Sequence, residues 1–453
     1  MANNFDKNWT TVNNNYPLND KEVERYISVK PSDNQLALVD KPFYTFMHFG
    51  MNTATDREWG AGVEKATDFT IKSIDAKQWV ETAKSAGATG VILTCKHHDG
   101  FCLWPSEYTS FCVKNSSYKG DIVKEVSDEC HKQGMDFGVY LSPWDMHDER
   151  YGTDAYNDYF CNQLTELLTN YGEIFEVWFD GAKGSNAKKF EYDWQRYYDL
   201  IRKLQPKANI AICGPDIRWV GNEGGKSRKS EYSVVPCALR EADRIMALSQ
   251  QDENQASSLQ KYNQMDEDLG SRKILEKNAY ICWFPAEVDV SIRKDNRNSK
   301  SAKKLFKIYL NSVGNNCTLL LNIPPTPQGE IHKKDAKNLK KLGSMIKNIT
   351  ANPIVYNELG ELTKDNGVLD FDFNDTRKVK YVVLQEDITK SQRVELFDLY
   401  IKKANGKYKR VYKGTVIGSK KIINLKGKKA KGIRFVIRQS RSNPVIKSIG
   451  IYE

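Results

Sequence analysis

Short apolar segments alternate with stretches of helical periodicity over about the first 340 residues, and this alternation restricts the possible folds more than any other feature. The strand candidates are Tyr44–Phe49, Gly90–Cys95, Met135–Ser142, Ile174–Asp180, Asn209–Gly214 and Cys317–Pro325. Helices are expected between them at Ala76–Gly87, Asp121–Gly134, Tyr156–Tyr171 and Asp193–Leu204. Strand–helix units of about 40 residues place parallel strands side by side, and this length favours a (β/α)8-type barrel over an open sheet.

The last quarter of the chain has a different character. All nine cysteines lie between Cys95 and Cys317, and no tryptophan follows Trp283. Beyond Pro353 the sequence consists of short alternating apolar stretches separated by Gly, Asn, Lys and Ser, which is typical of an antiparallel β-sandwich. We therefore expect a (β/α)8-like domain at residues 1–348 and a β-sandwich domain at residues 349–453.

The positive charge of the chain is confined to this last part. The whole chain has 68 Lys and Arg against 58 Asp and Glu, a net charge of +10. Residues 351–453 hold 22 basic and 11 acidic residues, a net charge of +11, so the remainder is close to neutral at −1. A solvated lysine-rich surface explains this pattern better than an anionic partner, and no nucleic-acid-binding motif accompanies it.

Several protein classes are disfavoured by the sequence. Nine cysteines without a CxxC pair argue against a disulfide framework. No apolar run approaches the roughly 18 to 20 residues of a membrane span, so we expect no membrane partner. The first residues, MANNFDKNW, lack the pattern of a signal peptide. The chain as written is therefore expected to be cytoplasmic, or periplasmic or secreted if a leader has been removed.

Polar and aromatic residues follow the predicted strands. In a (β/α)8 barrel the active site lies at the C-terminal ends of the strands. The residues at these ends are His48, His97, His98, Asp99, Tyr140, Ser142, Trp144, Trp178, Asp180, Asp216, Arg218, Trp219 and Glu223. A single tryptophan there is usually part of the core and a single aspartate can cap a helix, so the argument depends on five strand ends converging. Aromatic faces beside carboxylates and imidazoles suit a sugar.

The adjacent histidines His97 and His98 invite comparison with a metal site. Neighbouring residues on a strand point to opposite faces, which disfavours joint coordination. The sequence has no HExxH motif and no Cys/Asp cluster at ligand spacing. We therefore expect no metal at these histidines.

Seven segments form an ordered series from about Phe43 to Ile331. They are MHFG (47–50), TCKHHDGFCLWPSEYTSF (94–111), FGVYLSPWD (137–145), EVWFDGAKG (176–184), GPDIRWVGNEGG (214–225), WFPAEVDVSIR (283–293) and LLLNIPPTPQGEI (319–331). This series resembles the retaining α-L-fucosidase family, and HHDGF followed by WFDG is a specific combination. The β-rich C-terminal part also fits the family's usual second domain.

The resemblance implies roles for individual residues. It implies a double displacement that uses neither a metal nor a cofactor, with Asp180 of WFDG as the expected nucleophile. GPDIRWVGNE resembles the branch of the family that cleaves α-1,3 and α-1,4 linkages, which makes Glu223 of GNE the expected acid/base. Glu287 of PAEVD is the second candidate for that role, with an ion pair to Arg293 as its structural alternative. The positions expected to bind fucose are His48, Glu58, Trp59, His97, His98, Tyr140, Trp178, Arg218 and Glu287.

Physical chemistry agrees with these roles. A retaining glycosidase needs one ionised carboxylate and one protonated carboxyl, about 5 to 5.5 Å apart. Glu223 lies on a glycine-flanked loop, where shielding by tryptophan would raise its pKa. Fucose has a methyl group in place of a hydroxymethyl group, which favours an apolar wall. Phe101, Trp178 and Trp283 are candidates for that wall, although each could equally belong to the core.

One segment departs from the family pattern. After SIR the family commonly continues with a Pro-Gly-Trp segment, whereas this chain reads KDNRNSKS at residues 294–301. We expect this loop to border the leaving group, so the sequence constrains the leaving group less than fucose itself. The expected activity is exo-hydrolysis of α-1,3/1,4-linked fucose from branched, Lewis-type glycans. A broad or α-1,2 specificity and a non-catalytic fucose-binding protein are the alternatives, and the C-terminal domain is expected to be structural rather than glycan-binding.

Overall fold

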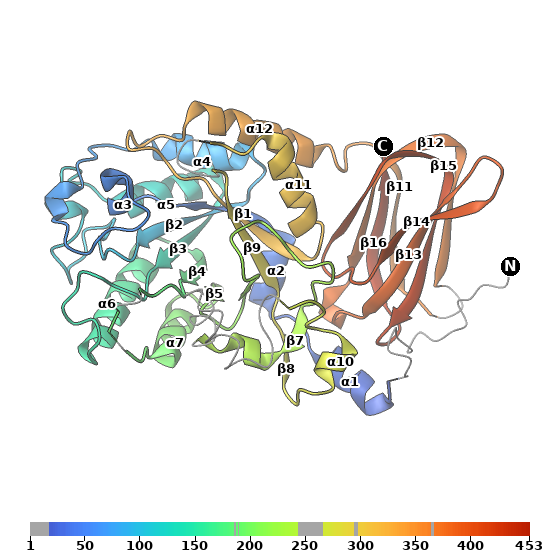
Figure 1. The fold of residues 1–453 in the computed structure, drawn as a ribbon, viewed down its shortest axis with the longest axis horizontal. Helices are drawn as coiled ribbons and strands as arrows, with labels where there is room; N and C mark the ends of the chain where they lie inside the picture. Colours follow the sequence, from blue (N-terminus) through green and yellow to red (C-terminus); the bar gives the residue numbers. More distant parts are fainter. Residues whose placement is uncertain (1–17, 185–186, 189, 243–265, 294–297, 364–366) are drawn as a thin grey trace.

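The computed structural model describes residues 18–184, 187–188, 190–242, 266–293, 298–363 and 367–453, which form a barrel followed by an antiparallel β domain (Figure 1). Eight parallel strands make the barrel sheet in the order β5-β4-β3-β2-β1-β10-β9-β6. They are β1 (Phe43–Met47), β2 (Gly90–Lys96), β3 (Asp136–Leu141), β4 (Ile174–Phe179), β5 (Asn209–Ile212), β6 (Arg218–Trp219), β9 (Ala286–Ser291) and β10 (Cys317–Asn322). A bridge between Ala211 and Ile217 brings the two edges together, so the barrel is nearly closed. The predicted (β/α)8-type fold is confirmed.

Helices cover the outside of this barrel, as Figure 1 shows. The main ones are α4 (Ala76–Ser85), α5 (Ile122–Gln133), α6 (Ala155–Asn170), α7 (Trp194–Leu204), α11 (Ala302–Ser312) and α12 (Lys333–Lys347). Helix α5 shows why they form where the sequence predicts. The Asp121 side chain accepts the N–H of Lys124 at its start, and Gly134 takes the left-handed conformation (φ 68°) at its end. Strand β2 is buried along its whole length, as expected of a parallel strand covered on both faces.

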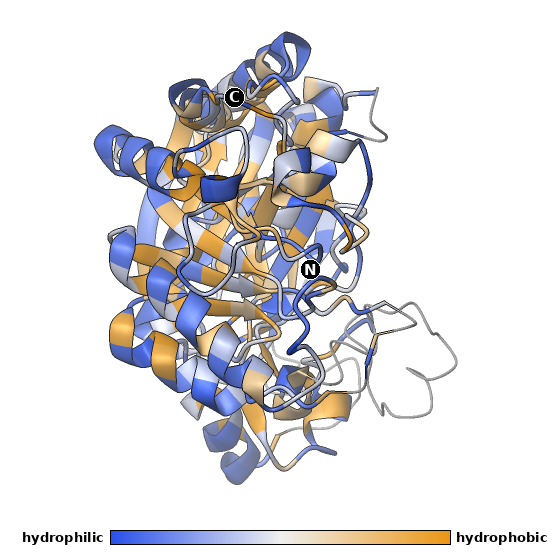
Figure 2. Ribbon diagram, turned by 90° about the vertical axis from the view of Figure 1, so that its left-hand side faces the viewer, coloured by the Kyte–Doolittle hydropathy of each residue, from blue (hydrophilic) through white to orange (hydrophobic). Residues whose placement is uncertain are grey.

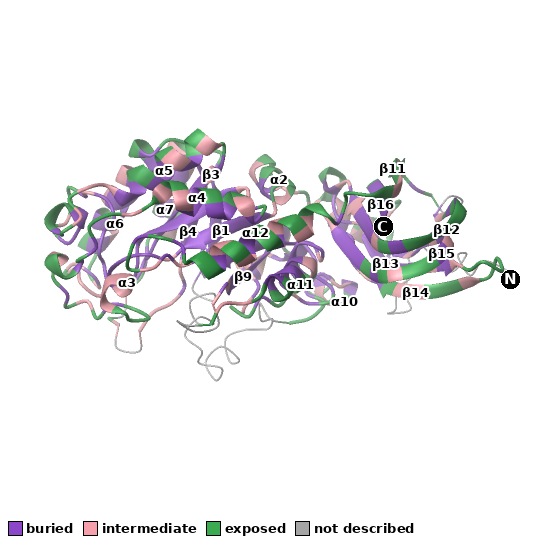
Figure 3. Cartoon of the chain, turned by 90° about the horizontal axis from the view of Figure 1, so that it is seen from above, coloured by how far each residue is buried: buried purple, intermediate pink, exposed green. Residues whose placement is uncertain are grey.

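Shorter elements complete the barrel domain. They are α1 (Asp20–Ser28), α2 (Asp33–Asp40), α3 (Met51–Thr55), η2 (Ala66–Asp68), η3 (Val113–Asn115), β7 (Val234–Pro236), η4 (Cys237–Arg240), α10 (Arg272–Leu275) and β8 (Ile281–Trp283). Hydrophobic residues concentrate on the strands, while the outward faces of the helices are polar and exposed (Figures 2 and 3). Among the described residues, no helix has both the length and the apolar character needed to span a membrane.

The C-terminal domain is antiparallel, as predicted. Its strands are β11 (Pro353–Glu361), β12 (Val368–Glu386), β13 (Val394–Lys402), β14 (Tyr408–Gly414), β15 (Lys421–Ser440) and β16 (Val445–Tyr452), with η5 (Ile388–Lys390) between β12 and β13. They pair in the order β11-β16-β12-β15-β13-β14 around a core of their own. The long strands β12 and β15 change register between Asp372 and Arg377, which bends the sheet. The predicted domain boundary at residues 348/349 lies between α12 and β11.

Polar contacts join the two domains. The Oδ1 atom of Asn316, which precedes β10, accepts hydrogen bonds from the backbone N–H (2.8 Å) and the hydroxyl of Ser419. A second contact between the domains is the ion pair of the buried Arg272 of α10 with Glu395 of β13. These contacts hold the β domain against the barrel.

Candidate active site

Asp180 directly follows β4 and is held by two hydrogen bonds. Its Oδ1 accepts the N–H of Ala182 at 2.7 Å, and its Oδ2 accepts the hydroxyl of Tyr140 from β3 at 2.9 Å. The Nε2 atom of His98 lies 3.8 Å from the same Oδ2. The side chain of Asp180 remains 21% exposed, so this fixed carboxylate is open to a ligand on one side.

The loop after β2 places His97 and His98 beside Asp180. Gly100 in this loop has a φ of 88°, and a Cβ there would lie 2.5 Å from Oδ1 of Asp145. Only glycine fits this turn, because any side chain would clash as well as strain the backbone. The HHDG segment therefore encodes the turn that positions both histidines.

Three histidines and a tyrosine form a compact group around the carboxylate. The ring centroids of His97 and His98 are 4.2 Å apart, and those of His48 and His97 are 5.6 Å apart. His97 also stacks on Tyr140 with an interplanar angle of 10°. The two neighbouring histidines lie close together because β2 ends at Lys96, so the expected alternation of a strand does not apply to them.

Burial makes all three imidazoles weak bases. It lowers the pKa of His48 and of His97, and it lowers the pKa of His98 to about 3. All three rings are therefore neutral near pH 7 and can both donate and accept hydrogen bonds. Within the described residues, the buried Nδ1 of His97 has no hydrogen-bond partner.

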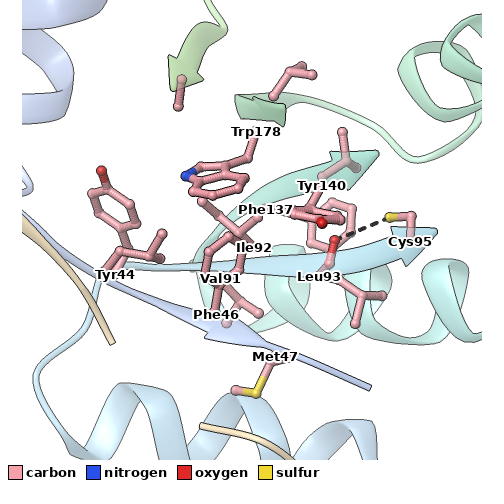
Figure 4. Packing of buried hydrophobic residues seen from close by; sticks show 14 of the residues in the cluster. Tyr44, Phe46, Met47, Val91, Ile92, Leu93, Cys95, Phe137, Tyr140 and Trp178 are labelled. Carbon is pink, nitrogen blue, oxygen red and sulfur yellow. Dashed lines mark hydrogen bonds between the residues drawn. The ribbon is translucent and has the colours of Figure 1, made fainter. Parts of the chain in front are cut away.

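Trp178 forms an aromatic wall inside the barrel, and Figure 4 shows it beside Tyr140. The two rings stack with centroids 5.4 Å apart, and Phe46 meets Trp178 edge-on at 5.0 Å. The indole N–H of Trp178 donates to Oε1 of Glu287 at 2.9 Å, while the hydroxyl of Tyr44 donates to Oε2. Glu287 thus fixes the orientation of Trp178.

Glu287 itself is fully buried, with 0% of its surface exposed. Burial raises its pKa, and burial together with the charge of Glu287 raises the pKa of the neighbouring Glu176. The ion pair with Arg293 that was the structural alternative for Glu287 does not form, because Arg293 pairs with Asp335 of α12 at 3.1 Å. The bonds of Glu287 to Tyr44 and Trp178 explain the conformation of this carboxyl without a catalytic role.

Glu223 lies on the loop after β6, which is attached to β9. The N–H of Gly225 donates to the carbonyl of Asp289 at 3.3 Å, and Gly224 forms a bridge with Val290. Glu223 is an exposed residue. The protein around its carboxyl nevertheless desolvates it and raises its pKa, and the negative charges of Asp180 and Glu58 raise it further. The structure thus places Glu223 within electrostatic reach of Asp180.

The remaining predicted residues lie in different environments. Trp59 is 43% exposed and meets His98 edge-on at a centroid distance of 5.3 Å, so it lies beside the histidine group. Arg218 is fully buried, and its partners are Glu231 at 3.1 Å and the carbonyl of Tyr232 rather than the histidine group. Its role in substrate binding stays a prediction.

The other two aromatic candidates pack in the hydrophobic core. Phe101 stacks on Phe69 with centroids 4.8 Å apart, and Trp283 packs with Leu18 and Tyr26. Of the three residues considered for the apolar wall, Trp178 is the one that contacts Tyr140. The segment expected to border the leaving group lies partly outside the described residues, at 294–297.

Two polar residues of the site were missed by the sequence analysis. Asn322 is the last residue of β10, and its Oδ1 lies 3.2 Å from Nδ1 of His48. The rule that active-site residues lie at the C-terminal ends of barrel strands would have identified Asn322. Asp289 of β9 accepts the indole N–H of Trp219 at 3.0 Å, and burial and then the charge of Glu223 raise its pKa. The sequence pattern that could have identified Asp289 is the alternation of Glu287 and Asp289 with valines along β9.

Comparisons with known proteins show the family of the chain. The family described as alpha-L-fucosidase matches residues 44–350, which is more than half of the chain. The chain belongs to the α-L-fucosidase family. It is similar to Alpha-L-fucosidase 1 of Arabidopsis thaliana, with 35% identity over 93% of this chain and 87% of that protein. The putative alpha-L-fucosidase 1 of Oryza sativa subsp. japonica is 32% identical over 93% of this chain and 84% of that protein.

Solved structures extend the similarity to the whole fold. A putative alpha-L-fucosidase from Bacteroides ovatus is 42% identical with a TM-score of 0.86, and covers 95% of this chain and 75% of that chain. A Ruminococcus gnavus GH29 fucosidase in complex with fucose is 28% identical with a TM-score of 0.78, and covers 94% of this chain and 95% of that chain. This α-L-fucosidase is accordingly a glycoside hydrolase rather than a non-catalytic fucose-binding protein.

Replacing Glu287 with glutamine tests the second candidate for the acid/base. Glutamine keeps an oxygen that can accept the N–H of Trp178 and removes the proton-transferring carboxyl. We expect kcat/KM on a fucosylated oligosaccharide to stay within about tenfold of the wild type, whereas loss of a general acid costs about 10²- to 10⁴-fold. Steady-state kinetics and the melting temperature, measured together, separate a catalytic loss from a structural one.

Proposed function

We propose that the enzyme is a retaining exo-α-L-fucosidase that removes α-1,3- or α-1,4-linked fucose from branched, Lewis-type glycans. Retention requires an ionised carboxylate and a protonated carboxyl at one scissile bond. The observation that carries the proposal is that Glu223 lies within electrostatic reach of Asp180. Asp180 accepts hydrogen bonds from the hydroxyl of Tyr140 and the N–H of Ala182, whereas desolvation and the charge of Asp180 raise the pKa of Glu223, which favours its protonated form.

In the first step, an oxygen of Asp180 attacks the anomeric carbon of the α-fucoside as the bond to the leaving oxygen breaks. Glu223 gives its proton to that oxygen, so the leaving sugar departs as an alcohol and Glu223 becomes a carboxylate. The product on the enzyme is a β-linked fucosyl ester of Asp180.

In the second step, Glu223 removes a proton from water, whose oxygen attacks the anomeric carbon and displaces Asp180. Two inversions release fucose with its original α configuration. Formation of the ester neutralises Asp180 and removes its negative charge from Glu223. The pKa of Glu223 falls accordingly, which suits its change from acid to base.

Fucose recognition is supported by the neutral polar groups around Asp180. The imidazoles of His48, His97 and His98 offer ring nitrogens to sugar hydroxyls, and Trp178 offers an aromatic face. The Ruminococcus gnavus fucosidase, whose structure contains fucose, supports the same sugar for this chain.

The linkage preference is supported by the GPDIRWVGNE segment and by the position of Glu223. Oligosaccharides carrying fucose in single, defined linkages provide the test, with the released fucose quantified by mass spectrometry. We expect release from α-1,3 and α-1,4 linkages and at least about tenfold slower release from α-1,2 linkages. Equal rates on all three would replace the proposal with the broad-specificity alternative.

Treatment with a chelator should leave activity unchanged, because proton transfer and nucleophilic attack are both assigned to carboxylates. The measurement is kcat/KM after dialysis against EDTA, compared with a sample dialysed against buffer alone. A loss that a divalent ion restores would contradict the predicted metal-free mechanism. It would direct attention to the adjacent pair His97 and His98.

A further inference from the structure

Ser142, which follows β3, contacts His98, the hydroxyl of Tyr140 and the backbone. It is fully buried, and its N–H donates to the carbonyl of Lys96 at 3.0 Å. Its hydroxyl oxygen lies 2.6 Å from the carbonyl oxygen of Trp144 and 2.7 Å from Nδ1 of His98. These two short contacts determine where the hydrogens lie.

The hydroxyl of Ser142 has one hydrogen, and a carbonyl oxygen can only accept. Two oxygens 2.6 Å apart require a hydrogen between them, so the Ser142 hydroxyl donates to Trp144. Ser142 can then only accept from His98, which places a hydrogen on Nδ1. Because burial lowers the pKa of His98 to about 3, the ring is neutral and its Nε2 has no hydrogen.

The unprotonated Nε2 of His98 faces another hydrogen-bond acceptor. It lies 3.8 Å from Oδ2 of Asp180, which is too far for a hydrogen bond. That oxygen already accepts the hydroxyl of Tyr140. The ring edge beside Asp180 therefore lacks a donor, and a substrate hydroxyl can supply one.

His48 follows the same pattern through a different partner. Its backbone N–H lies 3.4 Å from Oδ1 of Asn322, which identifies this atom as an acceptor. The Nδ1 of His48 lies 3.2 Å from the same oxygen and must donate to it. Because the ring is neutral, its Nε2 is also unprotonated. Two histidines of the site thus present lone pairs rather than N–H groups.

We propose that Ser142 is a positioning residue that holds His98 in its Nδ1–H form, so that His98 accepts a hydrogen bond from one substrate hydroxyl. This inference deepens the proposed function, on which it rests for the identity of the sugar as L-fucose. It predicts that the enzyme distinguishes a hydroxyl group from a fluorine at that position, because fluorine cannot donate.

The first test is the tautomer of His98 in the full-length wild-type enzyme without substrate. Long-range ¹⁵N–¹H NMR distinguishes the two neutral forms, and the His98→Asn variant identifies the His98 signals among the six histidines. We expect the Nδ1–H pattern near pH 7. An Nε2–H pattern or a charged ring overturns the proposal, and this measurement requires no variant of Ser142 to fold.

The second test uses Ser142→Ala, which removes the acceptor for Nδ1–H. We expect the signals of His98 to shift toward the Nε2–H form, and Ser142→Thr to restore the wild-type pattern. Ser127→Ala is the matched control, because Ser127 is also fully buried and donates to a backbone carbonyl, that of Lys124 at 3.0 Å. An unchanged tautomer in a folded Ser142→Ala variant contradicts the assigned role.

The third test compares the binding of L-fucose with that of its mono-deoxyfluoro analogues by calorimetry. Replacing the hydroxyl that donates to His98 should weaken binding to the wild type about tenfold. The same replacement should weaken binding to the Ser142→Ala variant by a smaller factor than it weakens binding to the wild type. If no analogue is discriminated, His98 does not accept from the sugar and the proposal fails. A failure to hydrolyse α-1,3/1,4 linkages would instead contradict the proposed specificity and leave the tautomer result intact.

Discussion

Replacing Asp180 with alanine is expected to reduce kcat/KM on a fucoside by at least about 10³-fold, because the first displacement then has no nucleophile. The loss should be similar for natural oligosaccharides and for substrates with a good leaving group, since both need the attack of Asp180. Steady-state kinetics on a nitrophenyl fucoside and on an oligosaccharide provide the measurement. A variant that keeps more than about a tenth of the wild-type activity would contradict the assignment.

The matched control is Asp136→Ala, at the other end of the neighbouring strand. Asp136 begins β3 and forms an exposed ion pair with Lys41 at 2.7 Å, and such surface pairs contribute little to stability. Azide distinguishes the loss of a nucleophile from a general disturbance of the site. In Asp180→Ala it should enter in place of the carboxylate, attack the α-fucoside directly and give the β-fucosyl azide.

The sequence predicted the regular part of the barrel well. Strands β2, β3 and β4 are apolar runs buried on both faces, and helices α4 to α7 carry clear 3.6-residue periodicity. Two barrel strands were not identified individually. Strand β6 has only two residues, and β9 carries Glu287 and Asp289 among its valines, which hides its apolar character.

The site was predictable where residues follow strand ends, and less so where partners come from elsewhere. The positions of His48, His98 and Asp180 follow from the topology of a parallel barrel. The partners of Arg293 and Arg218 do not, because Asp335 and Glu231 lie on other segments that sequence spacing does not bring together. Which charged residues pair is decided by tertiary packing, so motif reading locates candidate residues more reliably than it assigns their contacts.

The expected effects of Glu223→Ala differ from those of Asp180→Ala. In this variant kcat/KM should fall about 10²- to 10⁴-fold on a natural oligosaccharide, because its leaving sugar needs a proton. The fall in kcat/KM on a nitrophenyl fucoside should be much smaller. Because desolvation and the charges of Asp180 and Glu58 raise the pKa of Glu223, the wild type keeps its acid form to higher pH than an ordinary glutamate. Its kcat/KM should fall as pH rises through that pKa, and the variant should lack this fall.

Azide should rescue Glu223→Ala by a route different from that in Asp180→Ala. With a nitrophenyl fucoside, Asp180 can still form the β-linked fucosyl enzyme, but the variant has no base to activate water. Azide needs no base, so it attacks this intermediate and inverts it to the α-fucosyl azide. The two variants should therefore give opposite anomers, which NMR distinguishes, while the control Glu173→Ala, an exposed residue just before β4, should give neither azide in quantity. Near-normal turnover of an oligosaccharide by Glu223→Ala would move the acid/base role to another carboxyl, with Glu287 the next to test.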